Sequence, residues 1–89
     1  MSIGIAIQQI AKYSSLMEAL APQIQAKEGE LLLAVNDPNK AKVGEIQQVL
    51  TRLKTLMGLA KDFMEFWKEI IKSVMGIFKS INELAQGAR

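Results

Sequence analysis

The sequence predicts an all-α protein: an antiparallel two-helix hairpin with a kinked first helix and a long second helix, which assembles into a helical oligomer. Three observations lead to this prediction. Apolar residues recur at alternating spacings of three and four along most of the chain, which is the period of one helical face. One cluster of turn-forming residues, Asn36-Asp37-Pro38-Asn39, divides the pattern in two. The second half carries more apolar residues than the first half can cover.

The first helix is expected over about residues 3–35. Only Lys27 interrupts its apolar spacing. Pro22 lies inside the segment and lacks the N–H group of an interior helical residue, so we expect a kink or short break near Ala21 and Pro22. The helix would then consist of two pieces, about 3–20 and 22–35. Its periodic apolar positions are Ile3, Ala6, Ile10, Tyr13, Met17, Leu20, Ile24, Leu31 and Ala34.

Residues 36–39 are expected to form the turn. Asn, Asp and Pro each favour turns, and Pro38 biases Asp37 away from helical dihedral angles. Asp37 is also a favourable N-cap with Pro38 at the first helical position, so we expect the second helix over about residues 39–86. A short connection makes the two helices antiparallel neighbours. Residues 1–89 are therefore predicted to form a single hairpin domain.

The second helix has the strongest pattern in the sequence. From Ile46 onward, alternating steps of three and four residues reach apolar residues twelve times in succession, which is an unbroken heptad seam. These positions are Ile46, Val49, Leu53, Leu56, Ala60, Phe63, Trp67, Ile70, Val74, Ile77, Ile81 and Leu84. One further position in each heptad is apolar and widens the stripe: Leu50, Met57, Met64, Ile71, Phe78 and Ala85. The apolar exceptions on the remaining faces are Leu59, Phe66 and Met75.

The first helix is too short to cover this stripe. Leaving about six of the widening side chains exposed forgoes roughly 10 kcal/mol of burial free energy, which is comparable with the stability of a small domain. Exposed apolar surface of this extent marks an interaction surface. Gly58 and Gly76, inside the predicted helix, would allow a close approach of another helix. The predicted self-assembly or partner interface consists of Phe63, Met64, Trp67, Ile70, Ile71, Val74, Ile77, Phe78 and Ile81.

The composition argues against several functional classes. Cys and His are absent, so we expect no disulfide, no metal site and no cofactor. The formal net charge is +2, and the basic residues are spread among acidic ones, so nucleic acid is not a predicted partner. No catalytic motif occurs, and the chain is predicted not to be an enzyme. The Met residues and Trp67 are interpreted as packing residues in preference to a peptide groove or a membrane anchor.

Residues 1–9 lack the basic region of a cleavable signal peptide, and no stretch approaches the roughly 18 apolar residues of a membrane-spanning helix. If the protein leaves the cell, we expect it to do so by a route that uses no such peptide.

Residues 36–81 resemble the needle subunits of bacterial type III secretion systems. The likeness lies in the Asx-Pro turn, the segment Val-Gly-Glu-Ile-Gln-Gln-Val-Leu at 43–50, and the run Ile-Ile-Lys-Ser-Val-Met-Gly-Ile-Phe-Lys-Ser-Ile at 70–81. It implies helical polymerisation, in which the C-terminal half of the second helix packs against copies of itself around a narrow conduit for unfolded cargo. The first helix and the turn would face outward. The resemblance also implies a bacterial protein that is cytoplasmic before assembly and is then secreted or placed at the cell surface without a cleavable signal peptide. An inner-rod subunit of the same apparatus is also compatible with these residues.

Two other functions are compatible with the sequence. One is a small partner-binding hairpin or secretion chaperone that forms a discrete dimer or heterodimer. Other secretion-apparatus proteins or chaperones are further possible partners of the chain. The other, less favoured because the polar face mixes Glu with Lys, is a membrane-active amphipathic protein. Secreted hairpins of the Trp-x-Gly type are disfavoured, because Trp67 is followed by Lys68 and Glu69 in the middle of a helix.

Overall fold

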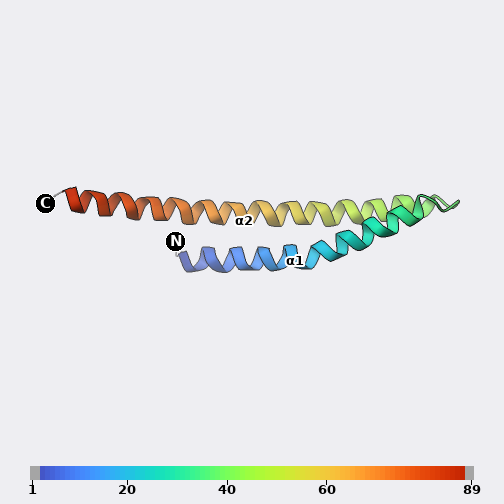
Figure 1. Ribbon diagram of the computed structural model, residues 1–89, viewed down its shortest axis with the longest axis horizontal. Coiled ribbons are helices and arrows are strands. Elements are labelled where there is room, and N and C mark those ends of the chain that lie inside the picture. The colour runs from blue at the N-terminus through green and yellow to red at the C-terminus, as the bar shows by residue number, and fades with distance from the viewer. Residues whose placement is uncertain (1–2, 88–89) are drawn as a thin grey trace.

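The computed structural model describes residues 3–87, and within them it consists of two helices with no strand. Helix α1 spans Ile3–Ala34 and helix α2 spans Ala41–Gly87. The two run antiparallel from a turn at one end of a rod that measures 79 × 17 × 16 Å (Figure 1). The prediction of an all-α two-helix hairpin is confirmed.

Helix α1 continues without interruption through Pro22, where the sequence suggested two pieces. Its axis nevertheless bends where the ribbon changes from blue to cyan, in the part of the helix that contains Pro22 (Figure 1). A proline inside a helix removes one backbone hydrogen bond and displaces the neighbouring turn. The side-chain amide of Gln23 donates a hydrogen bond to the carbonyl of Ala19 at 3.2 Å on this turn. The helix thus accommodates the proline by bending.

The turn is held by two Asx hydrogen bonds in succession. Asp37 Oδ1 accepts from the backbone N–H of Asn39 at 2.9 Å, and Asn39 Oδ1 accepts from the backbone N–H of Ala41 at 3.1 Å. The second bond is the N-cap interaction of α2, because it satisfies one of the unpaired N–H groups of the first turn. The predicted cap at Asp37 is therefore wrong by two residues. Asp37 instead closes the turn that presents Asn39.

The core is a thin seam between the two helices. Its buried residues are all apolar, and among the described residues no large side chain is fully buried. Three of the five are alanines, whose small side chains let the helices approach closely. The buried residues are Ala6, Leu20, Ala34, Leu50 and Ala60.

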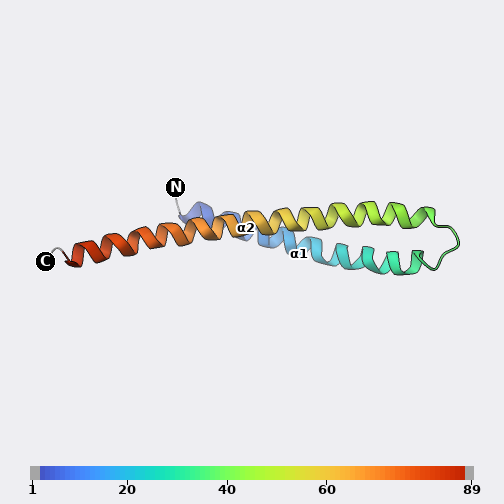
Figure 2. The same cartoon turned by 90° about the horizontal axis from the view of Figure 1, so that it is seen from above.

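Helix α1 winds around α2. Its N-terminal half is clearly separated from α2 in one view, and its C-terminal half is separated in the perpendicular view (Figures 1 and 2). This is the expected result of keeping two heptad seams in contact, because a repeat of 3.5 residues drifts around a straight α-helix. Helix α2 has 47 residues and α1 has 32, so the C-terminal part of α2 projects beyond α1.

Candidate self-association surface

The inner face of α1 follows the sequence pattern throughout. All ten positions of the three-four series, Lys27 included, are buried or half-buried against α2. Lys27 keeps its ammonium group in solvent and pairs with Glu30, with Nζ and Oε2 2.9 Å apart. A long lysine stem can lie along an apolar seam in this way. The one polar residue in the series therefore does not interrupt the packing.

The face of α2 that packs on α1 differs from the predicted seam. We name it the inner row. It combines every second member of the predicted seam, beginning with Ile46, with the additional apolar position of each heptad, beginning with Leu50. Along the length of α1 every member is buried or half-buried. The inner row consists of Ile46, Leu50, Leu53, Met57, Ala60, Met64, Trp67, Ile71 and Val74.

The other edge of the stripe faces away from the seam. We name it the outer row; it consists of Val49, Leu56, Phe63, Ile70, Ile77 and Leu84. All of these except the half-buried Ile70 are exposed. The expectation that these positions form the hairpin seam is therefore wrong for α1–α2 packing. Phe63 still contacts α1, because its ring stacks on Tyr13 with centroids 5.3 Å apart and an interplanar angle of 20°.

Leu59 and Phe66 extend the outer row on its solvent side. Both are exposed, and each lies three residues after an exposed member of that row, which is one helical turn. Phe66 also meets Trp67 edge to face, with centroids 5.5 Å apart. These two residues were not among the predicted interface positions. The sequence did contain a signal for them, because residues 56, 59, 63, 66 and 70 are all apolar and follow a second three-four series beside the predicted heptad seam.

A continuous unpartnered surface lies on the overhang, which we define as residues 75–87 of α2; no described residue of α1 covers it. Every residue in it is exposed, whereas Val74 just before it is half-buried. At about 1.5 Å per residue the overhang is roughly 20 Å long. Both rows continue through it without a covering helix. Its large apolar side chains are Met75, Ile77, Phe78, Ile81 and Leu84.

The structure divides the predicted interface into two groups. Met64, Trp67, Ile70, Ile71 and Val74 are half-buried, so α1 already covers part of each. The exposed group consists of Phe63, Ile77, Phe78 and Ile81.

In the turn, Asp37 is half-buried, whereas Asn36, Pro38 and Asn39 are exposed. These four residues lie at the end of the rod opposite the overhang (Figure 1).

The polar faces carry weak, solvent-exposed ion pairs. Lys54 Nζ lies 3.6 Å from Glu28 Oε1, which joins the two helices, and Lys68 Nζ lies 3.7 Å from Glu65 Oε1. Exposed pairs of this kind contribute about 0–1 kcal/mol each. Apolar packing, and not electrostatics, therefore dominates the stability of the hairpin.

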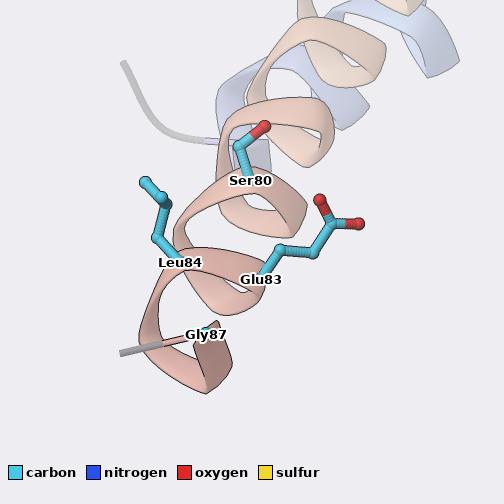
Figure 3. A pocket seen from close by; sticks show the side chains of 4 residues that line it. All are labelled: Ser80, Glu83, Leu84 and Gly87. Carbon is cyan, nitrogen blue, oxygen red and sulfur yellow. The ribbon is translucent and has the colours of Figure 1, made fainter. Parts of the chain in front are cut away.

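The depressions on the rod are shallow. One on the overhang is lined by Ser80, Glu83, Leu84 and Gly87, which all belong to α2 (Figure 3). Side chains from a single helix leave a ligand open to solvent, whereas small-molecule sites bury most of their ligand. Residues 3–87 contain no group of three or more Asp or Glu side chains that could hold a metal ion. In the same residues, neither helix has an apolar stretch sufficient to cross a membrane.

The glycines of α2 are open to solvent. A Cβ atom at Gly58 or Gly76 would meet nothing within 4 Å. The close helix approach that these glycines would allow therefore does not occur between α1 and α2.

No protein-family model matches the chain, and searches among curated proteins and among solved structures find no match either. The function is therefore inferred from the residues and the surface described above.

Proposed function

We propose that this chain is a self-assembling structural subunit of a protein secretion apparatus, forming a needle-like filament that encloses a conduit for exported proteins. The overhang and the outer row of α2 pack against other copies, and α1 lies on the outside. The secretion role is suggested by the likeness of residues 36–81 to needle subunits. The self-assembly is supported by the exposed surface of the hairpin itself.

The observation that carries the proposal is the uncovered overhang. Four large apolar side chains, Ile77, Phe78, Ile81 and Leu84, project from a single helix with no covering element among the described residues. Burying each one completely would be worth about 1.5–3 kcal/mol. A solitary amphipathic helix gains none of this free energy, and contiguous exposed patches of this kind normally mark an interface.

The total exposed area agrees with assembly. The hairpin exposes 6712 Å², whereas a compact monomer of its 9.8 kDa mass would expose about 5200 Å². The excess is about 1500 Å², roughly twice the 800 Å² or so that one partner contributes to an interface of standard size. Each copy therefore has enough surplus surface for two interfaces, which is what an open filament requires.

The test is the mass and shape of the purified chain together with one substitution. We expect light scattering and negative-stain microscopy to show filaments for the unchanged chain. Ile77→Asp should abolish them and leave a soluble helical monomer, because it places a charge in the outer row near the start of the overhang. Circular dichroism checks that the monomer remains helical.

Asn82→Asp is the matched control. It adds the same carboxylate to the same overhang at an exposed position beside the apolar rows, and filaments should persist. A discrete species of two or four unchanged chains would contradict the filament proposal and favour a partner-binding hairpin. Unchanged filaments from Ile77→Asp would show that the interface lies elsewhere.

A further inference from the structure

The two ends of the rod carry its most exposed apolar side chains. Leu33 is 77 % exposed and Leu32 70 % at the turn end, and Leu84 is 74 % exposed on the overhang; every other large apolar side chain described is less exposed. The ends lie at opposite extremes of the 79 Å long axis (Figure 2). Surplus apolar surface is thus concentrated where the next molecule along the axis would meet this one.

The overhang has a vacant place in line with α1. Phe78 and Ile81 continue the inner row, which α1 covers as far as Val74. Helix α1 begins at Ile3, and no described residue lies over these two side chains. The vacant place therefore has the shape of one more length of helix, laid along α2 as α1 is.

The turn end offers a surface that fits this place. The exposed Leu33 belongs to an open depression that is lined by three apolar residues, Leu33, Ala34 and Ile46, and three charged residues, Glu30, Asp37 and Lys42. Protein interfaces likewise combine apolar with polar residues. An apolar side chain that projects from another molecule would be received there.

The charges of the two ends are mixed. The turn end carries Glu28, Glu30 and Asp37 beside Lys27, Lys40 and Lys42, and Lys42 lines the depression itself. The overhang carries one lysine, Lys79, and one carboxylate, Glu83. Like charges therefore do not oppose a contact between the turn end and the overhang, and the exposed apolar side chains favour it.

Given the proposed self-assembly, we infer that the turn end of one copy docks in the α1-like place along the overhang of the next copy. The depression at Leu33 faces Phe78 and Ile81 of the neighbouring copy. This contact is heterologous, so repeating it produces an open filament and not a closed dimer. The outer row at Ile77 stays free for lateral packing, so the two interfaces use different edges of the stripe.

Cysteine cross-linking tests this contact cleanly, because the natural chain has no cysteine. Two single variants, Leu33→Cys and Ile81→Cys, are mixed under assembly conditions and oxidised with copper phenanthroline. Both side chains are exposed, so the substitutions should not unfold the hairpin, which circular dichroism verifies. We expect the mixed 33–81 disulfide dimer to be the main product. The chain carrying both substitutions should give a ladder of several chains, since its own two cysteines lie at opposite ends of the rod.

Lys61→Cys, exposed on the polar face of α2, replaces Leu33→Cys in the control mixture. Because a disulfide requires Cα atoms within about 4.4–6.8 Å, the 33–81 product should exceed the control product by about tenfold. A predominance of 81–81 dimers, or a 33–81 yield no greater than the control, would overturn the head-to-tail contact. Filaments of the unchanged chain without the 33–81 product would refute this contact alone. If the unchanged chain remains monomeric under assembly conditions, the proposed self-assembly itself is refuted.

Discussion

Two sections of the same helix make an informative comparison. Residues 43–74 of α2 and the overhang, residues 75–87, carry the same apolar repeat, yet only the first section has a helix packed against it. In the first section the inner row is buried or half-buried, whereas in the overhang every residue is exposed. A heptad pattern stabilises a chain only where another helix covers it, since most helical stability in proteins comes from packing of the apolar face. The overhang is therefore the part of α2 whose apolar face has no packing partner among residues 3–87.

The largest contrast should appear when the same side chain is truncated in each section. Leu50 is 7 % exposed and Leu84 is 74 % exposed. In the Ile77→Asp background, which is expected to be monomeric, Leu50→Ala should lower the free energy of unfolding by about 2–5 kcal/mol. Leu84→Ala should change it by less than about 0.5 kcal/mol. Urea unfolding followed by circular dichroism measures both values, and equal losses would mean that the overhang is covered in the monomer.

A smaller effect should come from the aromatic contact between the helices. The Tyr13–Phe63 stack should show a coupling free energy of about 0.5–1.5 kcal/mol in a double-mutant cycle of alanine substitutions. Phe78 has no aromatic ring against it among residues 3–87. Pairing Tyr13→Ala with Phe78→Ala in the same background should therefore give additive losses. Coupling between Tyr13 and Phe78 would require a different register of the two helices.

The start of the paired section should respond to loss of its cap. Asn39→Ala removes the hydrogen bond to the N–H of Ala41 and should cost about 1 kcal/mol of stability. Asp37→Ala removes a turn hydrogen bond and leaves the cap in place, so thermal unfolding should show a smaller loss. A larger loss of stability from Asp37→Ala than from Asn39→Ala would show that Asp37 is the N-cap, as the sequence predicted.

The smallest effects should come from the glycines. Gly58→Ala meets no steric obstacle and should raise the free energy of unfolding by up to about 1 kcal/mol. Gly76→Ala is equally unobstructed but lies in the overhang, so it should increase amide protection of the last turns with little effect on global unfolding. Hydrogen exchange separates the two results. A global gain from Gly76→Ala as large as that from Gly58→Ala would show that the overhang unfolds together with the paired section.

The ten periodic positions predicted for α1 are all buried or half-buried, Lys27 included, whereas the packed face of α2 was predicted only in part. The α1 series was narrower than the covered face, because Gln9, Ser14 and Ala21 are half-buried as well. On α2 three positions per heptad are apolar, so the stripe can meet α1 with either of its two edges. Periodicity gives no preference between Leu50 and Val49, although the structure buries the first and exposes the second. Leu32 and Leu33 carried no periodic signal that marked them as surface residues of interest.

The number of helices, the position of the turn and the excess of apolar residues in the second helix could be predicted without the structure. These follow from local chemistry, namely the spacing of apolar side chains and the turn preferences of Asn, Asp and Pro. The folded hairpin was needed to show which edge of the stripe faces α1, where α1 ceases to cover α2, and that Asn39 is the cap. These depend on the register and winding of one helix on another, which are set by the packing of both surfaces together.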